Sequence, residues 1–201
     1  DMVPVLSWLF LKGRCRYCRA PVSIQYPVVE LLTASAFILC LLSKGPGMGS
    51  AIMCMFSGIL ITAAFIDARH MYIPDGIHVL ILLLSCISLA AGSAPSLMNR
   101  LGGSLLTGGF LALVNLLSRG GVGWGDVKLF AASGLLIGAA PAMTALLMGY
   151  VAAGLWYAVP LVRGRVGRKT QIPMAPFFAV SLMICGLWFR QLLLWYLGFF
   201  R

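Results

Sequence analysis

Acidic side chains are nearly absent from this chain. Of its 201 residues only five are Asp or Glu, and 10% are charged, whereas soluble domains usually carry about 25% charged residues. Hydrophobic residues make up 61% of the chain, and the mean hydropathy is +0.98. This composition leaves too little polar surface for a water-soluble particle, which excludes a soluble enzyme, a nucleic-acid binder and a disordered tail. We therefore predict an all-α, polytopic membrane protein.

The chain also lacks a disulfide framework and a cleavable signal peptide. Four of the six cysteines stand singly in apolar runs, where Cys behaves as a small hydrophobe. Only Cys15 and Cys18 form a spaced pair. The first ten residues have no basic start and are too short to span a membrane. Because the chain opens on Asp1 rather than Met, we expect that an N-terminal portion is missing.

Seven apolar segments have the composition of membrane-crossing helices, with the shorter ones expected inside the bundle. They cover residues 26–42, 50–66, 77–91, 101–118, 127–139, 141–162 and 174–189. The fifth and sixth are expected to form a tight helical hairpin, and residues 190–201 to lie at the membrane interface. The sequence predicts two parts, a cytoplasmic segment over 1–25 that holds the Cys pair and a transmembrane domain over 26–201.

The basic residues, which give a net charge of +10, are distributed unevenly between the loops. Seven spans place ten Lys and Arg on one side, whereas the opposite loops hold only Lys44 and Arg100. Positive charge is retained on the cytoplasmic side of membrane proteins, and the basic loop 163–169 suits an anchor on anionic membrane lipid. The rule predicts that four features share the cytoplasmic side: the Cys pair, Asp67, Asp75 and Asp126.

Asp67 and Asp126 are expected to reach the same membrane boundary from two different helices. Aspartate inside a membrane is costly, so each one needs a reason. Two carboxylates brought close together repel, and one is expected to keep its proton while the other ionises. Such a pair can activate water and polarise a peptide carbonyl without a metal or a covalent nucleophile. The alternative is that they form structural ion pairs with Arg69, Arg119 or Lys128.

Two further features have alternative interpretations, and a third has a structural one. Asp75 follows Pro74, so its carboxylate could cap the next helix. The glycines before Asp126, which include Gly123 and Gly125, would let a substrate backbone approach closely, or could form only a flexible loop. Gly134-x-x-x-Gly138 is typical of close helix packing in lipid.

Four segments, taken together and in this order, resemble the type IV prepilin peptidases. They are CRYCRAPVSIQYPVVELLTA at 15–34, IDARHMYIPD at 66–75, GWGDVKL at 123–129 and IPMAPFFA at 172–179. The resemblance implies a membrane aspartyl peptidase of the GxGD class in the bacterial inner membrane. Such enzymes remove the short basic leader of prepilins or pseudopilins at the cytoplasmic face, in pilus or type II secretion machinery. No nucleic-acid partner is implied.

The resemblance also assigns roles to residues of this chain. Asp67, the first acid of the D-x₇-D pattern, and Asp126, the acid of GxGD, would be the catalytic pair, and the peptidase step would need no cofactor. Asp75, Gly123, Gly125 and Lys128 would support them.

Many members of this family also methylate the new N-terminus with S-adenosylmethionine, an activity associated here with Gly13 and Arg14. Cys15 and Cys18 have the spacing of half a tetrahedral zinc site, and the other half would lie upstream; the alternative is two reduced cytosolic thiols. Full-length members begin with another transmembrane helix and often a first C-x-x-C pair, which this chain lacks. Ala175 stands where the family's IP-x-GP segment has Gly.

Two other classes of membrane protein remain open from the residues alone. A thiol–disulfide oxidoreductase would use Cys15 and Cys18, although the charge distribution places them on the reducing side. A small proton-coupled transporter would use the intramembrane acids as proton carriers.

Overall fold

The computed structural model describes residues 5–92, 95–164 and 172–199 of the chain. Within these ranges the regular secondary structure is helical, apart from one isolated β-bridge between Arg14 and Pro21. The helices are α1 (Leu6–Phe10), α2 (Gln25–Lys44), α3 (Met48–His70), α4 (Asp75–Ala90), α5 (Leu97–Leu117), α6 (Trp124–Ile137), α7 (Ala139–Val162) and α8 (Ala175–Gly198).

All seven predicted apolar segments are helices, which confirms the all-α, polytopic prediction. Five of them, α2, α3, α5, α7 and α8, are long and apolar enough to cross a membrane. The other two, α4 with 16 residues and α6 with 14, are shorter than the roughly 20 residues that a spanning helix usually needs. Helix α6 packs inside the bundle against α4, α5, α7 and α8, whereas α4 packs on α3 and α6 and exposes Val79, Leu80 and Leu83. The protein is therefore a multi-pass membrane protein with two short helices, of which α6 is internal and α4 is peripheral.

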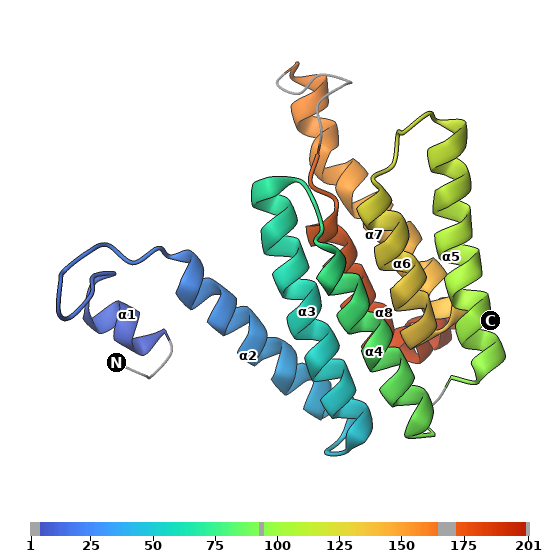
Figure 1. Cartoon of the computed structure of the whole chain (residues 1–201), viewed down its shortest axis with the longest axis horizontal. Helices are drawn as coiled ribbons and strands as arrows, with labels where there is room; N and C mark the ends of the chain where they lie inside the picture. Colours follow the sequence, from blue (N-terminus) through green and yellow to red (C-terminus); the bar gives the residue numbers. More distant parts are fainter. Residues whose placement is uncertain (1–4, 93–94, 165–171, 200–201) are drawn as a thin grey trace.

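The functional segments gather at one end of the bundle (Figure 1). The α3–α4 connection, the α5–α6 connection and the start of α8 lie at this end. It is called the dyad end here, after the pair Asp67 and Asp126. The α2–α3 and α4–α5 turns lie at the opposite end, and α2 leans away from the bundle toward its N-terminus. The bundle therefore brings Asp67, Asp75 and Asp126 to one boundary, as the loop charges predict.

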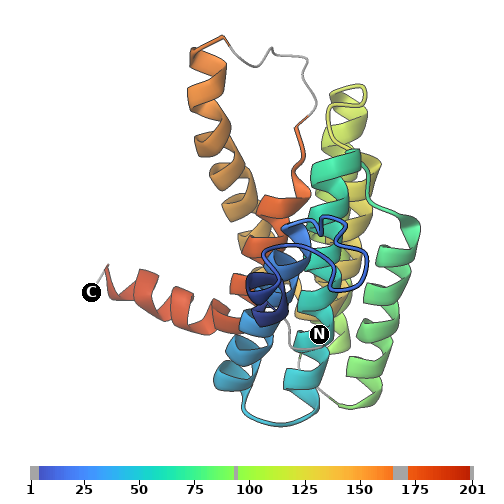
Figure 2. The ribbon, with the colours of Figure 1, turned by 90° about the vertical axis from the view of Figure 1, so that its left-hand side faces the viewer.

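Helices α6 and α7 form the expected hairpin, with Gly138 as the only residue between them. Gly138 has φ 89°, a conformation that a residue with a Cβ atom rarely adopts. Helix α8 contains a break at Trp188 (φ −124°, ψ 18°), and beyond it the helix turns away from the bundle (Figure 2). Residues 190–198 thus continue α8 in a new direction, and their interfacial position stays a prediction.

Arg100 was predicted to lie in a loop, and this prediction is wrong. It belongs to α5, is 1% exposed, and donates hydrogen bonds to the Pro95 carbonyl (2.9 Å), the Leu135 carbonyl (3.2 Å) and the Ser88 hydroxyl (2.8 Å). A buried charge is tolerated when hydrogen bonds satisfy it. Arg100 therefore ties α4, α5 and α6 together instead of marking a side of the membrane. Of the basic loop 163–169, residues 165–169 lie outside the described residues.

Glycines bring α5 and α6 into backbone contact. A Cβ atom added at Gly103 would lie 2.5 Å from the Gly134 carbonyl oxygen and 2.7 Å from the Gly138 carbonyl carbon. Small residues are favoured at helix contacts in membranes because they let the backbones approach. The packing interpretation of Gly134 and Gly138 is therefore confirmed, and their partner is Gly103. This contact fixes α6, the helix that begins beside Asp126.

Candidate active site

Asp67 lies on the last turn of α3 and is held by the first residue of α8. Its side chain is buried, with 7% exposure, and its Oδ2 accepts the backbone N–H of Ala175 at 2.9 Å. Ala175 begins α8 and Pro176 follows it, so the carboxylate also faces the positive end of the helix dipole. The IPMAP segment thus orients Asp67 through a backbone group. The Ala that replaces the family's Gly keeps this donor.

Asp126 lies in the first turn of α6, directly after the glycine loop. Gly123 precedes the helix in an extended conformation, and a Cβ atom at this position would lie 3.5 Å from Asp126 Oδ2. A Cβ atom at Gly125 would lie 3.3 Å from Ile73 Cβ. The glycine at 123 therefore leaves space beside the carboxylate, and the glycine at 125 lets α6 approach the α3–α4 connection.

Both aspartates line one cavity of about 820 Å³ at the dyad end, and the charge of Asp67 acts on the Asp126 carboxyl. Tyr150 of α7 also lines it, and its phenol is within electrostatic reach of Asp126. The remaining lining residues are Met71, Tyr72, Ile73, Gly120, Gly121, Val122, Gly123, Trp124, Gly125, Ile172 and Met174. The described lining thus combines two acids with apolar side chains and exposed backbone, and includes no Lys or Arg.

The structure does not support the ion-pair interpretation of the two aspartates through Lys128. The Lys128 ammonium is 2.6 Å from Asp75 Oδ1, and Asp67 hydrogen-bonds instead to the backbone of Ala175. Asp75 does not cap α4, because Pro74 is the N-cap residue and no side-chain cap bond forms. With its side chain 76% exposed and absent from the cavity lining, Asp75 lies outside the pair of acids.

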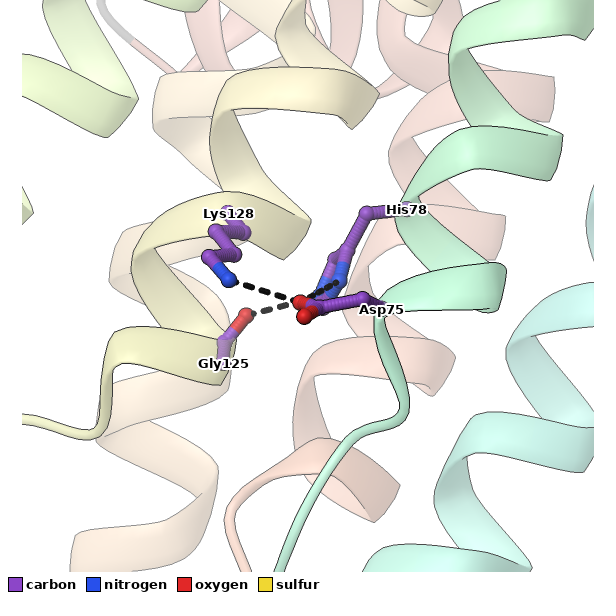
Figure 3. Close-up of polar contacts among 4 residues, drawn as sticks. All are labelled: Asp75, His78, Gly125 and Lys128. Carbon is purple, nitrogen blue, oxygen red and sulfur yellow. Dashed lines mark hydrogen bonds and ion pairs between the residues drawn. The ribbon is translucent and has the colours of Figure 1, made fainter.

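His78, one turn after Asp75, connects α4 to the residue before Asp126 (Figure 3). Its Nε2 is 3.1 Å from the Gly125 carbonyl oxygen, so Nε2 carries a proton and donates it. Its Nδ1 is 3.6 Å from Asp75 Oδ1, the oxygen that Lys128 also contacts. The buried ring and the Asp75–Lys128 pair together hold the first turn of α6 against α4. His78 was not among the predicted site residues, although a histidine three residues after Asp75 lies on the same face of a helix.

His78 is expected to position the active site without touching the substrate. We predict that His78→Leu lowers the rate of the leader cleavage that the resemblance implies about tenfold, because a buried carbonyl that loses its donor costs about 1–3 kcal/mol. His78→Gln keeps a donor in the side chain and should restore most of the rate. Cleavage of a prepilin by both purified variants measures this, and equal loss in the two would assign His78 a packing role only.

Asn115 anchors the glycine loop from the end of α5. The residue is buried, and its amide, oriented to satisfy its neighbours, donates to the Val122 carbonyl (2.7 Å) and accepts from Trp124 Nε1 (3.2 Å). The backbone N–H of Gly120 donates to the Asn115 carbonyl at 2.9 Å. Asn115 thus fixes both ends of the loop that leads to Asp126. An amide in an otherwise apolar run was the signal that the sequence analysis overlooked.

The N-terminal Cys pair forms a tight turn outside the membrane-spanning helices. The Cys15 N–H donates to the Ala20 carbonyl (2.9 Å), and the Arg19 N–H donates to the Cys15 carbonyl (3.0 Å). Backbone N–H groups of Cys18 and Tyr17 donate to the Cys15 sulfur and lower the pKa of Cys15 below the ordinary thiol value. This geometry suits a metal-binding thiolate, but the described residues contain no group of three or more His, Cys, Asp or Glu that could hold a metal. The described residues therefore offer two of the four ligands of a tetrahedral zinc site.

The lowered pKa predicts unusual reactivity of Cys15. The rate of its alkylation by iodoacetamide should reach half its maximum at a lower pH in the folded chain than in the chain unfolded in guanidinium, because only the thiolate reacts. Peptide mass spectrometry after timed labelling measures both curves. Identical midpoints would show that the backbone N–H groups do not stabilise the thiolate.

Gly13 and Arg14, expected to be associated with methyl transfer, lie at the start of the same turn. Gly13 has φ 69°, and a Cβ atom there would lie 2.9 Å from the Trp8 indole. The Trp8 indole N–H in turn donates to the Val22 carbonyl at 3.0 Å. Gly13 therefore has a structural reason to be glycine. Arg14 is exposed beside it, where a guanidinium can contact an anionic group.

Comparison with known proteins relates two stretches of the chain to one group of enzymes. Residues 54–158 match the type IV leader peptidase family, and residues 1–44 match the bacterial peptidase A24 N-terminal domain. No solved structure matches the chain.

Curated relatives align with nearly the whole chain. The prepilin leader peptidase/N-methyltransferase of Aeromonas hydrophila is 34% identical over 98% of this chain and 70% of its own length. The protein of the same description from Bacillus subtilis (strain 168) is 30% identical over 98% of this chain and 79% of its own. The type 4 prepilin-like proteins leader peptide-processing enzyme of Escherichia coli O78:H11 (strain H10407 / ETEC) is 39% identical over 90% of this chain and 68% of its own.

Proposed function

Since the chain belongs to the type IV leader peptidase family, we propose that it cleaves the leader from prepilins or pseudopilins with Asp67 and Asp126 as its catalytic pair. The observation that carries this proposal is the shared cavity, to which α3 and α6 each contribute one aspartate, with Asp126 within reach of the charge of Asp67. The enzyme would act at the cytoplasmic face of a bacterial inner membrane, where the basic loops predict that the dyad end lies.

The proposed chemistry needs only the two carboxyl groups and a water molecule. The ionised carboxylate takes a proton from water while the oxygen of that water attacks the scissile carbonyl carbon. The protonated carboxyl gives its proton to the carbonyl oxygen, which forms a neutral tetrahedral diol. Collapse of the diol returns the hydroxyl proton to one carboxylate, and the leaving nitrogen takes a proton from the other carboxyl. The backbone N–H of Ala175 holds Asp67 in place through the cycle.

The lining of the cavity suits a short basic leader next to an apolar segment. Asp67 and Asp126 are the only charged residues in the described lining, so a cationic leader is attracted to it. Met71, Ile73 and Met174 provide apolar contact for the residues that follow the cleavage site. The glycine loop exposes backbone on which an extended chain can lie.

A direct assay tests this function. The purified full chain is incubated in detergent with a purified prepilin in the presence of EDTA, and the product is identified by mass spectrometry. We expect a single cut that removes the leader. An intact prepilin after prolonged incubation with folded enzyme would contradict the proposal, as would cleavage that EDTA abolishes.

N-methylation of the new N-terminus is a second candidate function, favoured by the match of residues 1–44 to the N-terminal domain of the family. S-adenosylmethionine would supply the methyl group, and the exposed Arg14 could contact its carboxylate. The same assay with this cofactor should yield a mature pilin that is heavier by one methylene. Arg14→Gln is expected to lose the methylation and to keep the cleavage. Pilus or type II secretion machinery would use the product.

A further inference from the structure

A second cavity lies at the end of the bundle opposite the two catalytic aspartates. Its volume is about 590 Å³, and it lies where the end of α2, the start of α3, the α6–α7 junction and the break in α8 meet. Its polar lining residues are Ser43, Lys44, Ser88, Asn99, Arg190 and Gln191. None of these residues takes part in the peptidase chemistry, so this cavity is separate from the proposed catalytic site.

The charges in the described lining of this cavity are all positive. Lys44 ends α2, Arg190 follows the break in α8, and the described lining contains no Asp or Glu. Neither base has an ion-pair partner among the residues that the structure describes. Gly49 and Ala140 place the first turns of α3 and α7 at the same cavity, and the N-terminal end of a helix dipole favours an anion.

The rest of the lining is largely apolar. Its apolar wall includes Ile52, Met53, Leu136, Ile137 and Leu187. The break at Trp188 turns the end of α8 aside (Figure 2) and leaves Phe189 and Arg190 in the lining. Two exposed bases, Lys44 and Arg190, in the same cavity as this apolar wall match an amphiphile with an anionic headgroup and an acyl chain.

We propose that this cavity binds an anionic phospholipid of the leaflet opposite the catalytic pair, with Lys44 and Arg190 on the headgroup phosphate. The acyl chain lies along the apolar wall between α3, α6 and α8. The bound lipid fills the space between the break in α8 and the bundle and so holds the two together. This binding does not depend on whether the dyad cleaves prepilins.

Native mass spectrometry of the full chain tests the proposal. The protein is titrated with phosphatidylglycerol, with phosphatidylcholine and with inorganic phosphate, each in the same detergent. We expect one tightly held phosphatidylglycerol, at least tenfold weaker binding of phosphatidylcholine, and no displacement of the lipid by phosphate. Displacement by millimolar phosphate would show that the cavity takes a free anion and would overturn the lipid assignment.

A pair of charge-matched variants locates the site. Lys44→Gln/Arg190→Gln is expected to weaken phosphatidylglycerol binding at least tenfold, because each base near an anionic lipid contributes to its binding. Lys12→Gln/Arg163→Gln removes the same charge outside this cavity and should change binding less than twofold. Circular dichroism confirms that both variants are folded. Equal binding by the two double variants would contradict the proposed site.

Discussion

Replacement of Asp126 by Asn is expected to lower the rate of leader cleavage by at least about 10³-fold, and Asp67→Asn by a similar factor. An amide can neither take a proton from water nor give one to a carbonyl oxygen, so the chemical step is lost. The substitutions are nearly isosteric, and in the Asp67→Asn variant the new amide oxygen would still be able to accept the Ala175 N–H. Cleavage of a purified prepilin, followed by mass spectrometry, measures the loss.

Asp75→Asn is the matched control for these two variants. Its side chain is exposed and paired with Lys128 outside the cavity, and exposed ion pairs contribute only about 0–1 kcal/mol. The rate should therefore fall by less than about fivefold, the equivalent of that energy. If Asp75→Asn lowered the cleavage rate as much as Asp126→Asn, Asp75 would have to take part in catalysis.

Gly103→Ala is expected to separate α5 from α6 and to lower thermal stability strongly. The new methyl group would lie 2.5 Å from the Gly134 carbonyl oxygen and 2.7 Å from the Gly138 carbonyl carbon. Backbone atoms cannot move aside as a flexible side chain can, and overpacking of this kind costs about 1–3 kcal/mol or more. Because α6 begins beside Asp126, leader cleavage should fall together with stability.

Gly109→Ala, on the same helix, isolates the packing effect. A Cβ atom at Gly109 meets nothing within 4 Å, so both variants share the gain in helix propensity and only Gly103→Ala has the clash. Thermal unfolding in detergent, followed by circular dichroism, compares them. Equal melting temperatures would show that the contact between α5 and α6 adjusts without cost.

Composition and hydropathy were enough to predict the membrane class and the helices. The distribution of Lys and Arg placed Asp67, Asp75 and Asp126 at one boundary, because the loops between successive spans alternate sides of a bilayer and positive loops stay inside. The scarcity of acids then singled out the pair, since each buried carboxylate is costly and needs a function. Arg100 was wrongly assigned to a loop, because a buried arginine can direct its N–H groups to carbonyl oxygens inside the bundle.

Other parts of the site depend on contacts between distant segments, which periodicity does not reveal. The backbone N–H that orients Asp67 belongs to Ala175, 108 positions later in the chain. Tyr150 lies in the middle of an apolar helix, and only the packing of α7 brings it near Asp126. Asp75 looked like a helix cap because the cap signal is local, whereas its actual partner, Lys128, is 53 positions away.

The most direct test of the central claim compares three variants in the same cleavage assay. If Asp67 and Asp126 act as one catalytic unit, Asp67→Asn, Asp126→Asn and the double variant should leave the same residual rate, because removing either partner already abolishes the pair. Each protein is checked by circular dichroism before the assay. A single variant that retains at least a tenth of the original rate, or a double variant whose losses multiply, would contradict the shared catalytic pair.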